Sequence, residues 1–215
     1  MPTANEDHPP RRLHREVKRF RKWATPKQRQ YLEWELDYRG WDALAQAFRD
    51  VIADSEPETW DDEVVGLMLY TLARNNEYTW LKRDLVKNPR HLVVLARAGL
   101  PSPETNARWQ LAEALGYAGE PVESIALHER YFEDADEYVS RLALLGLGRR
   151  NYAHLERLAL RAWDRGDEWQ RIGALWALAQ VESPRLGPLL DAAEADGRER
   201  LVDHAGRIRA GERQA

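Results

Sequence analysis

The side chains most often used in catalysis and metal binding occur in this chain, but their spacing does not join them into a recognisable site. Its six histidines form no HxxxH or HExxH pattern, and no cysteine is present to act as a nucleophile, disulfide partner or thiolate ligand. The sequence also lacks a P-loop, a dinucleotide-binding fingerprint and a nucleophile elbow. We therefore expect no catalytic residue, no cofactor and no metal, and the remaining functional candidates are residues suited to binding.

Four aromatic residues follow the N-terminal segment at a spacing that suits an interface. They are Tyr31, Trp34, Tyr38 and Trp41. The spacing i, i+3, i+7, i+10 places them along one side of a helix, and Thr25 and Pro26 are suited to begin that helix, as N-cap and first helical residue. Tyr and Trp dominate interface hot spots but also fill cores, so the four either bind a partner or lie buried under the first repeat.

The chain begins with a basic segment and continues with an acidic body. The net charge is −4, yet residues 1–30 hold nine Lys and Arg against three acids, so the remainder is strongly acidic. Residues 11–27 place Leu13, Val17 and Phe20 on one face of a helix and basic residues elsewhere. This helix is docked with a solvated basic face, or contacts an acidic protein or the chain's own acidic body, or contacts nucleic acid or membrane.

Three segments of the chain repeat one helical pattern. When Arg108, Ser140 and Arg171 are aligned, at spacings of 32 and 31 residues, offsets +3, +4, +6 and +7 hold only Ala, Leu and Gly. These offsets form one helical stripe, and half of its residues are small, which lets a second helix approach closely. Residues 155–162 and 186–193 repeat the spacing i, i+3, i+4, i+7 and predict that second helix. The repeating unit is therefore a helical hairpin.

Charged and aromatic residues recur with the same period. Arg108, Arg141 and Arg171 lie near the starts of the repeat helices and either form a basic ladder for an acidic partner or pair with nearby acids. The acids expected to pair with them are Glu104, Asp136 and Asp167, of which the last two also occupy N-cap or first-turn positions. We expect the tryptophans of the repeats to fill the core or the space between repeats. They are Trp109, Trp163, Trp169 and Trp176.

The pattern predicts an all-α protein, with no strand of convincing length. We expect an α-solenoid of stacked antiparallel helical hairpins over residues 60–215, because each hairpin can bury its apolar stripe only against its neighbours. Before it we place a disordered tail over residues 1–10 and basic and aromatic helices over residues 11–55, packed on the array.

Three segments, ARWQLAEALG, VSRLALLGLG and QRIGALWALA, resemble HEAT repeats of the short bacterial kind, and the resemblance covers about residues 60–210. A period close to the roughly 34 residues of tetratricopeptide repeats makes that family the alternative, but Trp109 is not followed by Leu-Gly at the required offset. The HEAT resemblance implies an extended curved surface that binds a protein. Small bacterial arrays of this kind are also similar to immunity factors encoded beside toxins.

The resemblance also implies where a partner binds. In HEAT-like arrays the second helices line the concave side, and here they carry polar residues of mixed charge that suit a polar interface better than an apolar pocket. The residues implied are Arg130, His154, Arg157, Arg161, Arg185, Asp191 and Glu194.

These observations favour a non-catalytic protein-binding module that acts by steric occlusion or scaffolding, in its sharpest form an immunity protein that neutralises a basic bacterial toxin. The alternatives are an intracellular regulatory adaptor and a HEAT-like DNA glycosylase or other nucleic-acid-binding protein. The acidic body disfavours nucleic acid because it repels phosphates. No apolar run is long enough for a secretion signal or a membrane span, so we expect a cytoplasmic protein that does not contact membranes.

Overall fold

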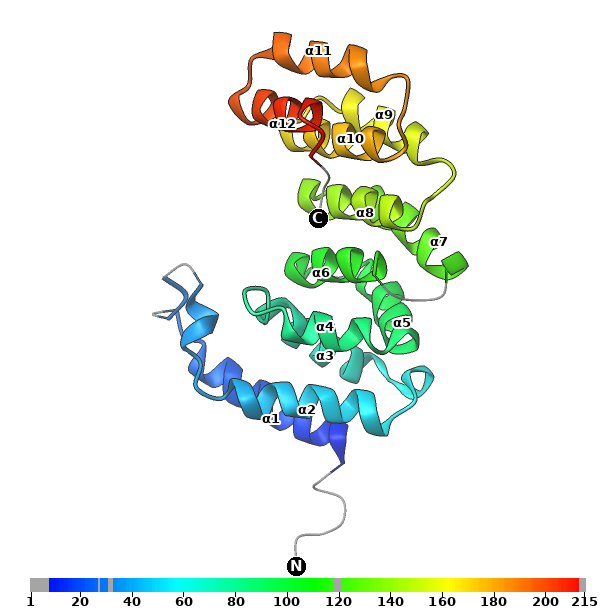
Figure 1. Ribbon diagram of the computed structural model, residues 1–215. Coiled ribbons are helices and arrows are strands. Elements are labelled where there is room, and N and C mark those ends of the chain that lie inside the picture. The colour runs from blue at the N-terminus through cyan, green and yellow to red at the C-terminus, as the bar shows by residue number, and fades with distance from the viewer. Residues whose placement is uncertain (1–7, 27, 31–32, 118–120, 213–215) are drawn as a thin grey trace, which may run out of the picture. The chain divides into compact units, whose positions relative to one another are not determined.

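The computed structural model describes residues 8–26, 28–30, 33–117 and 121–212, and all regular secondary structure among them is helical (Figure 1). The all-α prediction is confirmed for this part of the chain. The described residues divide into two compact units. Unit 1 runs to Ala114, and unit 2 comprises residues 115–117 and the chain from Pro121 on.

Unit 1 begins with two helices that pack against the helices that follow them. Its elements are α1 (Pro9–Trp23), η1 (Gln28–Gln30), η2 (Trp34–Asp37), α2 (Trp41–Asp54), η3 (Pro57–Thr59), α3 (Asp62–Arg74), α4 (Trp80–Val86), α5 (Pro89–Gly99) and α6 (Thr105–Leu115), where η denotes a 3-10 helix. α1 packs on α2 and α3, α2 on α3 and α4, and α5 on α3, α4 and η3. Leu13, Val17 and Phe20 bury the apolar face of α1, as the sequence predicts.

The N-terminal boundary of α1 differs from the expected one. α1 begins at Pro9, inside the segment 1–10 predicted to be disordered, because proline suits the first helical position. Residues 1–7 lie outside the described part of the chain. The predicted division into residues 11–55 and an array over 60–215 stays a prediction, since α1 and α2 belong to the same compact unit as α3 and α4.

The prediction of one continuous helix from Thr25 to residue 40 is wrong. The described residues there form only η1 and η2, and Glu33 before η2 has a left-handed backbone with φ +57°. The cause is tertiary: this segment turns so that Trp34 and Tyr38 contact Phe20 of α1, and the Trp41 indole N–H donates to the Glu35 carbonyl at 2.6 Å. Aromatic burial against α1 replaces the regular helix that the spacing predicts.

Unit 2 is a series of helices in which each packs on its sequence neighbours, and every second helix from α8 to α12 also packs on the next but one. They are α7 (Pro121–Phe132), α8 (Glu137–Arg149), α9 (Leu155–Asp164), α10 (Glu168–Gln180), α11 (Leu186–Asp196) and α12 (Glu199–Arg209). α8 packs on α10 and α10 on α12, while α7, α9 and α11 pack on members of that row (Figure 1). The predicted stripes are buried on α8 and α10, with Leu144, Leu147, Leu175 and Leu178 fully inaccessible.

The predicted helix boundaries of unit 2 are confirmed where they depend on capping. Asp136 accepts a hydrogen bond from the Val139 amide, and Asp167 accepts from the amides of Trp169 and Gln170. These side chains satisfy amides that the first helical turn leaves unpaired. Because both aspartates serve as caps, the arginines expected to pair with them have other partners, described below.

Small residues on α8 and α10 allow the close helix packing that the stripe predicts. A Cβ atom on Gly146 would lie 2.5 Å from the His128 ring of α7, and one on Gly173 would lie 2.9 Å from the Arg141 side chain of α8. Both distances are shorter than van der Waals contact, so only glycine fits while these helices keep their spacing.

None of the described helices combines the length and apolar character needed to cross a bilayer.

Candidate functional site

The polar residues implied by the HEAT resemblance lie on α7, α9 and α11 or directly before these helices. All seven are exposed. Arg161 pairs with Glu133 at 2.9 Å and lies over the Phe132 ring, whereas Asp191 and Glu194 both bind Arg209 of α12. Arg161, Asp191 and Glu194 therefore take part in surface contacts between neighbouring helices.

The other four members of that set lie at the surface, on their helices or directly before them, and Arg157 is exposed on α9. Arg130 is exposed on α7, and Arg185 precedes α11. His154 precedes α9, and its ring is 5.5 Å from the Tyr152 ring. The contacts tie residues of α9 to α7 and residues of α11 to α12, so the set is divided between separate helix junctions.

The predicted aromatic side of residues 31–41 becomes an aromatic cluster around Phe20. Tyr31 lies outside the described residues. Distances from the centre of the Phe20 ring to its neighbours are 5.6 Å for Trp23, 5.8 Å for Trp34, 4.8 Å for Tyr38, 5.5 Å for Trp41 and 6.1 Å for Tyr70. Trp41 is only 4% exposed, whereas Trp34 and Tyr38 are partly accessible. Burial raises the pKa of the Tyr38 hydroxyl, so it stays neutral over the physiological range. This cluster stabilises the junction of α1 and α2.

A row of neighbouring guanidinium and aromatic groups crosses α8, α10 and α12 of unit 2, and sequence reasoning missed it. We call it the Arg–aromatic ladder. Its members are Tyr138, Arg141, Trp169, Arg200, His204, Trp176 and Arg207. The Arg141 guanidinium lies 5.1 Å from the Tyr138 ring centre and 4.8 Å from that of Trp169, and Arg200 approaches Trp169 at 5.1 Å. These distances are those of cation–π contacts.

The second half of the ladder is built around His204. Its ring centre is 6.4 Å from Trp169 and 6.0 Å from Trp176, and Arg207 lies over Trp176 at 5.8 Å. The Trp176 indole N–H donates to His204 Nδ1 at 3.0 Å, which requires the neutral imidazole with its proton on Nε2. Burial, assisted by the charge of Arg207, lowers the pKa of His204 and favours that neutral form.

The ladder is anchored at one side and accessible at the other. Trp176 is 6% exposed, whereas Tyr138 is 42% exposed, and the side chains of Arg200 and Arg207 reach solvent. An open surface depression of about 580 Å³ lies beside Arg200 and His204, with Glu199, Val202 and Asp203 completing its lining. The ladder thus offers ring edges and guanidinium groups held in fixed positions.

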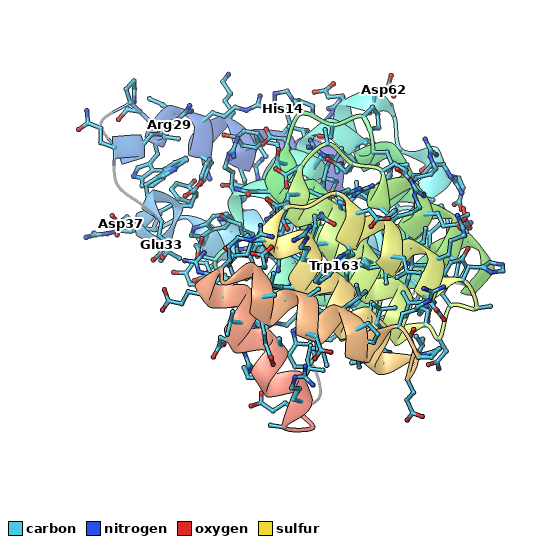
Figure 2. All side chains as sticks on the ribbon, turned by 90° about the horizontal axis from the view of Figure 1, so that it is seen from above. His14, Arg29, Glu33, Asp37, Asp62 and Trp163 are labelled. Atoms are coloured by element: carbon cyan, nitrogen blue, oxygen red, sulfur yellow. The ribbon has the colours of Figure 1, made fainter. Side chains whose placement is uncertain are left out.

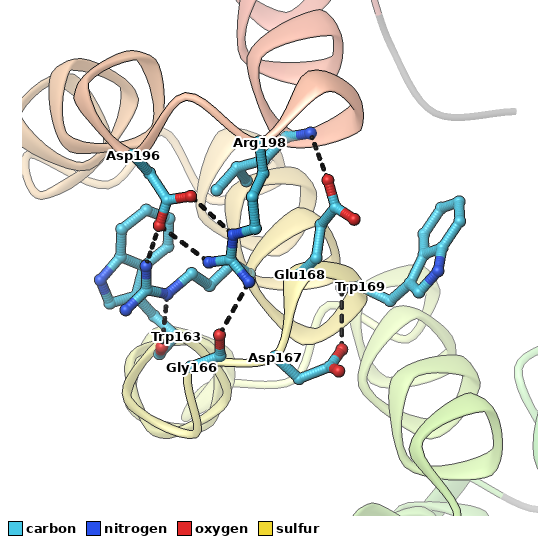
Figure 3. A network of polar contacts seen from close by, with 9 residues as sticks. Trp163, Gly166, Asp167, Glu168, Trp169, Asp196 and Arg198 are labelled. Atoms are coloured by element: carbon cyan, nitrogen blue, oxygen red, sulfur yellow. Dashed lines mark hydrogen bonds and ion pairs between the residues drawn. The ribbon is translucent and has the colours of Figure 1, made fainter.

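A polar network at the ends of α9 and α11 positions the helices that carry the ladder (Figure 3). Arg198 donates to both oxygens of Asp196, at 2.6 and 2.8 Å, and to the Gly166 carbonyl at 3.0 Å. Arg171 donates to Asp196 at 2.6 Å and lies over the Trp163 ring. The hydrogen bonds from Arg198 lower the pKa of the Asp196 carboxyl, which keeps it charged. In addition, the Leu201 amide of α12 donates to Glu168 of α10.

These contacts correct the ion pairs expected from the repeats. Arg171 pairs with Asp196 instead of Asp167, and Arg141 pairs with Glu137 at 2.7 Å instead of Asp136. Asp136 and Asp167 lie at the N-caps, where their carboxylates already accept backbone amides, so other acids neutralise Arg141 and Arg171. The third expected acid, Glu104, pairs with Arg74 at 3.1 Å.

A sequence signal for the ladder exists. Tyr138, Trp169 and Arg200 follow one another at intervals of 31 residues, and Trp176 and Arg207 are separated by the same interval. The repeated apolar residues do not mark these positions, because each position holds a different type of residue in successive repeats. Their common feature is a planar side chain that can stack.

Among the residues that the structure describes, no three histidine or carboxylate side chains gather closely enough to hold a metal ion. Comparisons with protein-family models, with curated proteins and with solved structures found no match to the chain. The ladder is therefore interpreted from its own chemistry.

Proposed function

We propose that this chain is a protein-binding module that acts by occupying a partner's surface, and that the Arg–aromatic ladder is its principal contact. The observation that carries the proposal is the row of Tyr, Trp and Arg side chains fixed across α8, α10 and α12. Trp, Tyr and Arg are the residues most enriched in interface hot spots. Because these side chains already stack on one another, ordering them on binding costs little additional side-chain entropy.

The proposed architecture is a HEAT-like α-solenoid, with a tetratricopeptide-like array as the alternative. It is supported within unit 2 by the row of α8, α10 and α12 and by hydrogen bonds between corresponding places in successive hairpins. Arg165 donates to a carbonyl 33 residues earlier, at Phe132, and Arg198 to one 32 residues earlier, at Gly166. A similar bond between the ends of successive hairpins, with a span close to the repeat period, is typical of stacked repeats.

Local charge favours a protein over a nucleic acid as the partner. Two of the ladder guanidiniums already have carboxylate partners, since Arg141 pairs with Glu137 and Arg207 with Glu212 at 2.8 Å. The third, Arg200, lines one surface depression together with the acidic residues Glu199 and Asp203. Nucleic-acid binding depends on unneutralised cations that replace counterions along phosphates, whereas a protein interface tolerates balanced charge.

The most specific form of the proposal is an immunity protein that binds a basic bacterial toxin in the cytoplasm. It is supported by the net charge of −4, concentrated outside the basic first 30 residues, because an acidic surface accelerates encounter with a basic partner. An intracellular adaptor would use the same surface for a different partner. The two differ in outcome: an immunity protein abolishes the activity of its partner in a purified mixture.

The test is affinity capture from the native organism, followed by calorimetry with the purified partner and variants that fold normally. Tyr138→Ala and Arg200→Ala alter the ladder, and Arg130→Ala alters an exposed position on α7 as the matched control. We expect each ladder variant to weaken binding by about tenfold or more and the control to change it less than about twofold. Full binding by both ladder variants, or a loss only in the α7 variant, would refute the ladder as the contact.

A further inference from the structure

Unit 1 contains a separate groove that the proposed function does not use. It has a volume of about 830 Å³ and lies between α1, the segment from Asp54 to Trp60, and the first turns of α3. This volume is in the range of pockets that bind ligands. The groove belongs to unit 1 and the Arg–aromatic ladder to unit 2, so the two sites do not share a residue.

The two walls of the groove carry charges of opposite sign. The wall formed by α1 contributes Arg11, His14, Arg15 and Lys18. The opposite wall contributes Asp54, Glu56, Asp61 and Glu63. Figure 2 shows His14 of α1 and Asp62, which begins α3, projecting from the same edge of the protein. At one point the walls meet, where His14 Nδ1 lies 2.6 Å from Glu63 Oε1.

The floor between the walls is apolar and fixed. The Trp60 indole N–H donates to Ser55 at 2.8 Å, and the Trp60 ring lies 5.5 Å from the His91 ring. Val64 and Leu67 complete the floor and are 8% and 7% exposed. A side chain placed on this floor would therefore contact a surface that needs no rearrangement.

Some charges of the walls remain accessible to a ligand. Lys18 and Asp54 are exposed. Arg15 is 46% exposed and is held to Glu16 only at 3.4 Å, which is a weak contact. Arg15 and Lys18 are three residues apart on a helix, so their side chains point to the same side. The basic wall can thus bind an acidic group while the exposed Asp54 carboxylate binds a basic one.

We propose that this groove binds a peptide segment of mixed charge, in which an acidic side chain meets Arg15 and Lys18, a basic side chain meets the wall around Asp54, and an apolar side chain between them lies on Trp60. A peptide satisfies both walls. Nucleic acid or an anionic membrane would bring phosphates against the acidic wall, where like charges repel, and would leave the floor uncovered. The chain would then have two docking sites, one in each unit.

The experiment uses the full chain and a phage-displayed library of random dodecapeptides. Peptides enriched on the wild-type protein are sequenced, synthesised and titrated by fluorescence anisotropy against Lys18→Glu, Asp54→Lys and, as the matched control from unit 2, Arg130→Glu. We expect enriched peptides to carry an acidic, an apolar and a basic residue. Their affinity should fall about tenfold or more in both groove variants and stay unchanged in the control.

Charge reversal in the peptide provides the discriminating measurement. Replacing the acidic residue of an enriched peptide by lysine should weaken binding to the wild-type protein and restore binding to Lys18→Glu, a result that a folding defect cannot produce. The proposal is overturned if enriched peptides bind the groove variants as well as the wild type. It is also overturned if a mixed-sequence DNA duplex or phosphatidylserine vesicles bind in a Lys18-dependent way while peptides do not. If ladder variants weaken partner binding but no peptide binds the groove, only the groove proposal fails. If peptides bind the groove but ladder variants bind the partner normally, only the proposed function fails.

Discussion

Adding one methyl group to unit 2 should either stabilise or destabilise it, depending on which helical glycine receives the group. Gly146 in α8 faces α7, and a Cβ there would lie 2.5 Å from Nε2 and 3.0 Å from Cδ2 of His128. His128 is fully buried. Gly206 in α12 is exposed, and a Cβ there would meet nothing within 4 Å. Both positions are inside helices, so they share the same backbone preference for alanine.

The magnitudes follow from two opposing effects. Alanine stabilises a helix interior over glycine by about 0.5–1 kcal/mol, which is the whole effect expected for Gly206→Ala. Overpacking a filled core costs about 1–3 kcal/mol, and the upper part applies at Gly146 because a buried ring cannot rotate away as a flexible chain can. We therefore expect Gly146→Ala to lower the free energy of unfolding by about 1–2 kcal/mol, a gap of about 2–3 kcal/mol between the two variants.

Urea unfolding followed by circular dichroism measures both variants under the same conditions, with an unchanged denaturant slope as the sign that the unfolding transition is comparable. A His128→Ala background should remove the penalty of Gly146→Ala, because the methyl group then has space. The reasoning fails if Gly146→Ala is as stable as Gly206→Ala, or if the penalty persists without the His128 ring.

Three further outcomes are expected in unit 2. Asp167→Ala should lower the free energy of unfolding by about 1 kcal/mol through loss of the N-cap, and Asp167→Asn by much less, as measured by urea unfolding. A double-mutant cycle of Arg141 and Trp169 should give a coupling of about 1 kcal/mol, and a coupling near zero would mean that this stacking contributes nothing. The pKa of His204 is lowered from 6.5 by burial, so the unfolded state binds its proton first and stability falls as the pH drops below that value. His204→Gln should reduce this fall between pH 7.5 and 5.5, whereas an equal fall in both proteins would contradict the assignment.

One part of the candidate site can be predicted from the spacing of residues in the sequence, and the other part depends on tertiary packing. Tyr138, Trp169 and Arg200 are 31 residues apart, so these ladder residues occupy the same position in successive repeats of the sequence. Their stacking became visible only when α8, α10 and α12 were placed side by side. The groove of unit 1 had no sequence signal, because its walls come from residues 8–18 and 54–67, which tertiary packing brings together.

The sequence by itself determined the helices of the repeats, their buried stripes and their caps. These features depend on interactions within a few residues, such as Asp167 with the first turn of α10, and local interactions are written directly in residue order. It did not determine the path from α1 to α2, where an apparently regular aromatic spacing became two short 3-10 turns around Phe20. Nor did it determine which acid each arginine meets, since Arg171 finds Asp196 across a helix junction. Burial and long-range pairing are set by neighbours distant in the sequence, so only the tertiary structure decided them.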